Sequence, residues 1–257
     1  AMKNILKIML MMITIFTIAG SAVYAAEIPV SDQDQLITSS DWTEISNLQD
    51  EMKKEEPDAT IDYDKALKVY VDCNLIKLQT ADTKKLTSAL ESANYVWVIP
   101  FKMEKTYGMF TVAKGLPLRE EAKSVLTKAE QEEVKNHAGK WMITETAEHT
   151  VEPYYDILLE KREALSDCTR VVLVGSQPGM RQPVALGMDD ETARIWISLG
   201  YQYPVMEKIP ETQNVESGVY SFESVVEISD TYIEDSEVST GAGVQSRSSM
   251  KYVAGIG

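Results

Sequence analysis

The feature that most constrains the fold is a series of three strand patterns, joined by short turns, between residues 170 and 199. Val171–Val174 is a β-branched run that ends at a turn cluster of glycine, serine and proline, 175–179. Apolar residues then alternate over 184–188 and again over 193–197, on either side of an acidic turn. Strands that follow one another this closely predict an antiparallel sheet.

The last two of these strands also predict their own register. The predicted cross-strand pairs are Met188 with Ala193, Leu186 with Ile195 and Val184 with Ile197. Every apolar partner then falls on one face of the hairpin, whereas a slip of one residue would separate them. In this register Trp196 and Arg194 share the opposite face.

The rest of the chain predicts helices and further strands. A capping-box pattern at Asp41 and Glu44 begins a helix whose apolar spacing continues to Met52. Residues 141–146 fit either a helix end or a short strand. The other predicted elements are strands over 67–73, 95–101 and 109–113, helices over 86–93, 117–137 and 153–165, and one short element over 222–228.

Two of these elements carry packing predictions. If residues 104–107 form the loop of a hairpin, Phe101 faces Phe110 and Ile99 faces Val112. The helix that runs toward His137 is predicted to bury one apolar stripe, which consists of Leu118, Ala122, Val125, Leu126 and Ala129.

The order of the elements predicts an α+β domain. We expect a largely antiparallel sheet of about five to six strands with helices packed on one side. This order resembles that of PAS, Cache and profilin-like domains, and the resemblance implies a sensor-like role for an exported chain. An extra strand near Val69 and the long helical insert depart from that order.

The first 25 residues are typical of an export signal. Lysines precede an uncharged apolar run, 8–20, and Val23 and Ala25 occupy the positions that a signal peptidase reads. The run is shorter than the ~20 residues that span a bilayer. We expect Ala1 to be extraneous and the mature protein to begin near Ala26, to keep no membrane span, and to work outside the cell or in its envelope.

Loss of the two lysines in the leader changes the net charge from −15 to −17. Nucleic acid and anionic membranes would repel such a chain, so neither is an expected partner. We expect a polar arm and short helix over 26–60, one domain over 61–233, and a flexible tail over 234–257, whose glycine, serine and charge cannot bury a core.

Two cysteines, Cys73 and Cys168, leave two alternatives open. Export permits a disulfide, and each cysteine lies next to a predicted strand, so that neighbouring strand ends could bring the two together. Two buried free thiols fit the sequence equally well. Their spacing carries no metal-site signature.

No catalytic, cofactor or metal motif is present in the sequence. A zinc site needs three or four converging ligands, whereas His137 and His149 are twelve residues apart and no helical repeat aligns their rings. We interpret His137 as a solvated residue at a helix end and His149 as a loop residue. Neither cysteine has a basic neighbour suited to activating a thiolate, and a Gly-x-Ser-x-Gly motif is missing.

Three residues are candidate contact points for a ligand or partner. Trp196 and Arg194 lie away from the predicted apolar pairs, and tryptophan and arginine are enriched at binding hot spots. Arg181, at the tip of the 175–181 turn, could contact an anionic group. A helix over the sheet would instead make Trp196 part of the core, which is the commoner place for a large aromatic side chain.

These observations favour a secreted, non-catalytic domain that binds a small molecule, a peptide or a cell-surface component. A secreted hydrolase is one alternative, because two of the 40 acidic residues could form a catalytic pair whose separation the sequence does not reveal. An envelope-associated structural subunit is the other alternative.

Overall fold

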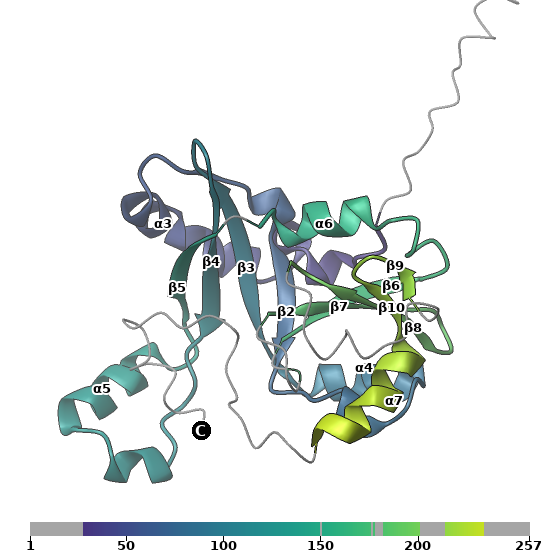
Figure 1. Ribbon diagram of the computed structural model, residues 1–257. Helices are drawn as coiled ribbons and strands as arrows, with labels where there is room; N and C mark the ends of the chain where they lie inside the picture. The colour runs from purple at the N-terminus through teal and green to yellow at the C-terminus, as the bar shows by residue number, and fades with distance from the viewer. Residues whose placement is uncertain (1–27, 150, 176, 178–181, 201–213, 234–257) are drawn as a thin grey trace, which may run out of the picture.

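The computed structural model describes residues 28–149, 151–175, 177, 182–200 and 214–233, and their centre is a twisted sheet (Figure 1). Within these residues the sheet has ten strands. The spatial order is β5-β4-β3-β2-β6-β7-β8-β10-β9, and β1 also pairs with β3. The strands are β1 (Thr60–Ile61), β2 (Leu67–Val71), β3 (Asn94–Lys102), β4 (Tyr107–Lys114), β5 (Trp141–His149), β6 (Arg170–Val174), β7 (Val184–Met188), β8 (Ala193–Ser198), β9 (Asn214–Glu216) and β10 (Val219–Ser221).

One parallel pair joins two antiparallel halves of this sheet. Val69 of β2 pairs with Leu173 of β6, and Tyr70 pairs with Val174. The sheet therefore has more strands than the five to six that we expected, and it is mixed because it contains this parallel pair. The cause is the connection through helix α6 (Tyr154–Glu160), which carries the chain from the β5 edge to the far side of β2, as a parallel pair requires.

Helices cover both faces of the sheet, so the prediction of helices on one side is wrong. Leu186 of β7 belongs to the cluster under α4 (Thr83–Glu91) and α7 (Phe222–Ile233). Its neighbour Ala185 belongs to the cluster under α6. Successive strand residues point to opposite faces, which places α6 opposite α4 and α7 (Figure 1).

The N-terminal part of the described chain contributes to the core. Helices α2 (Trp42–Ile45) and α3 (Gln49–Glu55) pack against β3 and β4. Leu36, Ile45 and Met52 are fully buried in this cluster. The expected arm and short helix are thus an integral layer of the fold, with the helix interrupted by a 3₁₀ turn.

Buried charges attach this layer to the sheet. The carboxylate of Asp34, 3% exposed, accepts hydrogen bonds from Ser31 Oγ at 2.7 Å and Tyr70 Oη at 2.8 Å. Its oxygens also lie 3.3 Å from an Arg170 nitrogen and 3.6 Å from Lys68 Nζ. A buried carboxylate is tolerated here because two cations and two hydroxyl groups face it.

Asp41 does not form the predicted capping box. Its side chain makes no cap hydrogen bond and instead accepts from Tyr95 Oη at 2.9 Å and Trp97 Nε1 at 3.0 Å. The capping box that does form joins Thr127 and Glu130 at the start of α5 (Lys128–His137). Tertiary contacts thus compete with local capping for the carboxylate of Asp41.

The hairpin of β3 and β4 is shifted by two residues from its predicted register. Phe101 pairs with Gly108 and Ile99 with Phe110. A shift of two keeps every side chain on its predicted face, so Phe101 and Phe110 still share the core, with ring centroids 4.8 Å apart. Gly108 is required because a Cβ there would lie 2.1 Å from the Phe101 ring.

The hairpin of β7 and β8 begins as predicted and then changes face. Met188 pairs with Ala193, but a bulge follows, and Leu186 then pairs with Trp196 instead of Ile195. The extra residue in β8 moves Trp196 to the α7 face of the sheet.

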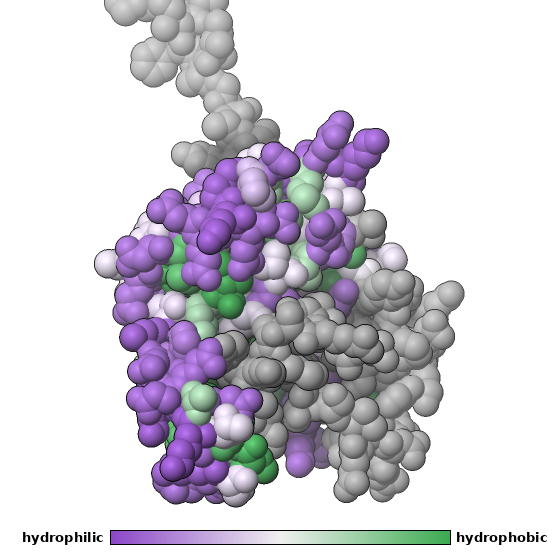
Figure 2. Space-filling view, turned by 90° about the vertical axis from the view of Figure 1, so that its left-hand side faces the viewer, coloured by the Kyte–Doolittle hydropathy of each residue, from purple (hydrophilic) through white to green (hydrophobic). Residues whose placement is uncertain are grey.

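The segment between β4 and β5 projects from the body as an arm, residues 116–138 (Figure 1). It contains a 3₁₀ turn (Glu121–Ser124) and α5 instead of one continuous helix. Of the predicted stripe only Ala122 is buried, and Val125 is 79% exposed. The stripe prediction is wrong because the arm does not lie on the sheet. Figure 2, which views the β5 side, shows a largely hydrophilic surface with a hydrophobic area at its lower end.

Candidate functional site

Two of the three predicted contact residues have other roles in the structure. Trp196 is fully buried and packs on Phe222 of α7 at 5.9 Å between ring centroids, so it belongs to the core. Arg194 is exposed, and its Nε donates a hydrogen bond to the Asp189 carboxylate in its own turn. The third, Arg181, lies outside the described residues. The structure therefore does not bring Trp196 and Arg194 together into a site.

Both cysteines are free thiols in the structure, Cys168 buried and Cys73 half-buried. Cys73 follows β2, Cys168 precedes β6, and the two strands are parallel, so the cysteines lie at opposite ends of the pair. Gln177 lies beyond the other end of β6, nine residues after Cys168, and its side-chain nitrogen donates to the Cys73 carbonyl at 2.6 Å. Cys73 therefore lies at the end of β6 that is remote from Cys168. Burial raises the pKa of each thiol to about 11.

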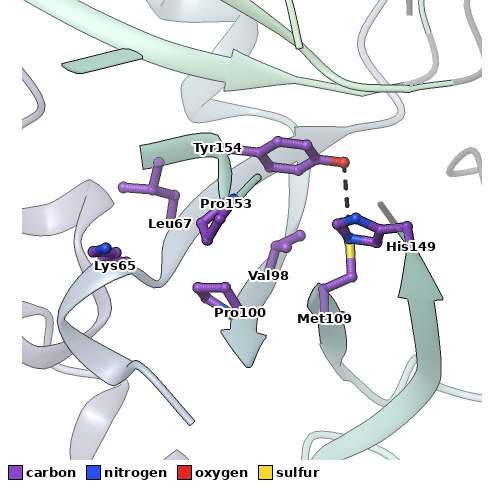
Figure 3. Close-up of a pocket in the computed structure, with 9 residues that line it drawn as sticks. Lys65, Leu67, Val98, Pro100, Met109, His149, Pro153 and Tyr154 are labelled. Carbon is purple, nitrogen blue, oxygen red and sulfur yellow. Dashed lines mark hydrogen bonds between the residues drawn. The ribbon is translucent and has the colours of Figure 1, made fainter. Parts of the chain in front are cut away.

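Two adjoining pockets, which share three lining residues and are treated as two lobes of one cavity, lie between α6 and the ends of β3, β4 and β5. Figure 3 shows the residues of the narrow lobe. The wide lobe has a volume of about 180 Å³ and the narrow lobe about 10 Å³. Met109, His149 and Tyr154 line both lobes. The wide lobe is further lined by Ala147, Glu148, Val151 and Gln182, and the narrow lobe by Lys65, Leu67, Val98, Pro100, Gly108 and Pro153.

Local sequence explains how the three shared residues meet. β5 ends at His149, and Pro153, four residues later, immediately precedes α6, since a proline with its fixed φ suits a helix start. Tyr154 is the first residue of that helix and points back over the sheet. Its hydroxyl donates a weak hydrogen bond to Met109 Sδ at 3.9 Å, and the His149 ring lies beside them (Figure 3).

His149 is the unusual member of this group. Both of its ring nitrogens are buried, and neither makes a hydrogen bond of normal geometry with a described residue. Burial lowers the pKa of His149, and the nearby backbone of Val151 opposes part of that shift. The ring is therefore neutral at pH 7, with one buried donor and one buried acceptor, and such groups cost about 1–3 kcal/mol each when unsatisfied.

Lys65 brings no unpaired charge to the narrow lobe. Its Nζ lies 2.9 Å from the Asp156 carboxylate and 3.6 Å from that of Asp62. The hydrogen bond to Asp156 raises the pKa of Lys65 most, against a smaller opposing effect of burial. The ammonium group is thus paired, and the three groups together carry a net charge of −1.

Glu145 lies on the same face of β5 as His149, four residues before it. One of its carboxylate oxygens is buried without a hydrogen-bond partner, and burial raises its pKa to about 7. At about 3.3 Å per strand residue, its Cα is roughly 13 Å from that of His149. The two side chains therefore do not form an acid–base pair.

The described lining carries hydrogen-bonding side chains from His149, Tyr154 and Gln182. Among the described residues no group of three or more His, Cys, Asp and Glu side chains could hold a metal ion. The same part of the chain contains no helix long and apolar enough to cross a bilayer. What the geometry offers is a small, mostly apolar cavity with an unsatisfied imidazole.

Sequence reasoning missed this site. His149 was predicted as a loop residue, but it ends a strand, and residues 141–146 belong to that strand. The β-branched residues Ile143, Thr144 and Thr146 favoured a strand, but the bulge at Thr144 breaks their alternation. Local sequence does not predict that the ring nitrogens of His149 lack hydrogen-bond partners, because this depends on which side chains of β4 and α6 pack beside the ring.

No protein-family model, no curated protein and no solved structure matches this chain. The resemblance in element order to PAS, Cache and profilin-like domains therefore gains no support from a structural match.

Proposed function

We propose that this chain is a secreted or envelope-located binding protein without catalytic activity, and that it binds its ligand in the cavity beside His149. The observation that carries the proposal is the pair of buried ring nitrogens, neither of which makes a hydrogen bond of normal geometry with a described residue. A ligand that pairs with them would remove a cost that the unliganded protein bears. Small-molecule sites commonly combine an apolar lining with a few such polar groups.

The hydrolase alternative has weaker support. Among the described lining residues Glu148 is the only carboxylate. It pairs with Gly108, whose missing Cβ would point to Phe101, so its side chain belongs to the opposite face of β5. On that face lies Glu56, whose pKa is raised mainly by burial and, to a smaller extent, by the negative charge of Glu148. A second carboxylate across the cavity, which glycoside hydrolysis needs, is missing from the described lining.

A screen of small fragments by ligand-observed NMR tests the proposal. The wild type is compared with His149→Phe, which keeps a ring and removes both nitrogens, and with His137→Phe as the matched control on the arm. We expect fragments that bind the wild type and the control but not His149→Phe. A screen without hits, or hits that bind all three proteins equally, would contradict the proposal.

The structural-subunit alternative is favoured by one observation, the projecting arm with Val125 79% exposed. If the arm joins subunits, sedimentation velocity should show assembly that grows with protein concentration and is lost in Val125→Asp. A monomer at every concentration tested would remove this alternative.

A further inference from the structure

The cavity beside His149 selects among ligands by their charge. We propose that it takes a small uncharged ligand that both donates and accepts a hydrogen bond, such as a primary amide or an alcohol, in preference to a carboxylate or an ammonium group. This inference rests on the proposed function and adds the chemical class of the ligand.

The volume sets the size of the ligand. The wide lobe, at about 180 Å³, is slightly larger than the cavity of about 150 Å³ that holds one benzene molecule in an engineered protein. The narrow lobe holds no more than about one water molecule. The ligand therefore has about six to eight non-hydrogen atoms, which excludes nucleotides and oligosaccharides.

Carboxylates are disfavoured because no described cation near the cavity is available to them. Lys65 is already paired with Asp156 and Asp62, and His149 is neutral at pH 7. The net charge of the whole chain, −15, adds a general repulsion. Within the described lining, an anion would lose its hydration without gaining a counter-charge.

Ammonium groups are disfavoured for the corresponding reason. The side chain of Glu148 belongs to the other face of β5, and Asp156 and Asp62, which contact Lys65, are not among the described residues that line the cavity. Glu145 shares the face of His149 but lies roughly 13 Å along the strand. A cation would therefore enter a cavity whose described lining offers no free carboxylate.

Neutral hydrogen-bonding groups match the lining. A neutral imidazole has one N–H donor and one nitrogen acceptor, and the Tyr154 hydroxyl can serve as either. Met109, Ala147 and Val151 supply an apolar wall for a short carbon chain. A primary amide carries both kinds of partner in one planar group, and an alcohol carries both on one oxygen.

Three probes of nearly equal size test the inference at pH 7.5: butyramide, butyrate and butylammonium. Each is titrated into the wild type while the ring ¹⁵N shifts of His149 are followed by NMR. The chain has two histidines, so His137→Phe assigns the signals without touching the cavity. For ligands this small we expect butyramide to bind with a dissociation constant of about 1–10 mM.

The inference predicts that butyramide shifts the His149 ring nitrogens and binds at least about tenfold more tightly than either charged probe. Tighter binding of butyrate or butylammonium would overturn it and leave the proposed function standing. If no probe binds but the fragment screen yields other hits, the inference alone fails. If neither experiment finds binding, both fail. Because the shifts are read on the wild type, the result does not depend on whether His149→Phe folds.

Discussion

Glu145 holds one carboxylate oxygen buried and unpaired within the described structure, and burial raises its pKa from 4.5 to about 7. Between these two values the folded protein keeps a proton that the unfolded chain has released. The free energy of unfolding should therefore fall as the pH rises through this window and stay lower above it. The folded state is thus more stable with Glu145 protonated than with Glu145 ionised.

Glu145→Gln should remove this pH dependence, because the amide resembles the protonated acid. We expect the variant to be about 1–2 kcal/mol more stable than the wild type at pH 8 and nearly equal to it at pH 4.5, after a discount for the part of the side chain that remains exposed. Urea unfolding at the two pH values measures this. Glu152→Gln, at an exposed position, is the control. An equal effect of Glu145→Gln at both pH values would contradict the account.

At the scale of elements, Asp34 is a polar contact of the N-terminal layer with β2 and β6, beside the backbone bridges Val30–Val171 and Gln35–Leu67. Its carboxylate faces Lys68 and Arg170, whereas the carboxylate of Asp41 faces only neutral donors, Tyr95 and Trp97. Removing a charge that pairs with buried cations costs more than weakening neutral hydrogen bonds. The two aspartates thus form a matched pair for experiment.

Asp34→Asn should destabilise the protein by about 2–4 kcal/mol, since it leaves Lys68 and Arg170 without their shared partner. Asp41→Asn keeps an acceptor oxygen and should cost about 1 kcal/mol. Urea unfolding gives both values, and hydrogen exchange should show faster exchange over residues 30–38 in Asp34→Asn. Equal costs for the two substitutions would count against the anchoring role.

The helices and strands also show how much of the fold could be predicted from the sequence. Period-two patterns located β2, β7 and β8, unbroken apolar runs located β3 and β6, and the Met188–Ala193 pair was predicted correctly. The bulge after this pair was not predicted, since an extra residue in one strand leaves the apolar pattern nearly unchanged. The parallel β2–β6 pair and the buried N-terminal layer depend on long-range packing, which local patterns do not encode. Whether the ring nitrogens of His149 find hydrogen-bond partners depends on the same long-range packing.

At the scale of the whole molecule, the strand order separates the two cysteines. Their strands run in parallel, with Cys73 beyond the end of one and Cys168 before the start of the other. No small local movement brings the two sulfurs to the distances that a disulfide needs. Export to an oxidising compartment would therefore not by itself create an internal bridge.

Alkylation of the unfolded protein without reductant, followed by mass spectrometry, should label two thiols. The folded protein should react slowly, because burial raises the pKa of both thiols to about 11 and keeps the thiolate scarce. A monomer that takes up no label until it is reduced would contradict the described topology.

Export remains a prediction from the first 25 residues. Expression of the full chain in a secreting host should yield a product whose first residue is Ala26, and substitution of Ala25 by a large charged residue should block processing. Intact-mass measurement of the product distinguishes the outcomes. An unprocessed chain that stays in the membrane fraction would refute the prediction.

The central claim is that a ligand satisfies His149 inside the cavity between α6 and β5. A crystal structure of the mature chain soaked with butyramide tests it most directly. The account predicts electron density for the amide in the wide lobe, within about 2.7–3.2 Å of a ring nitrogen of His149. Butyramide bound only elsewhere, with His149 hydrogen-bonded to other parts of the protein, would contradict the account.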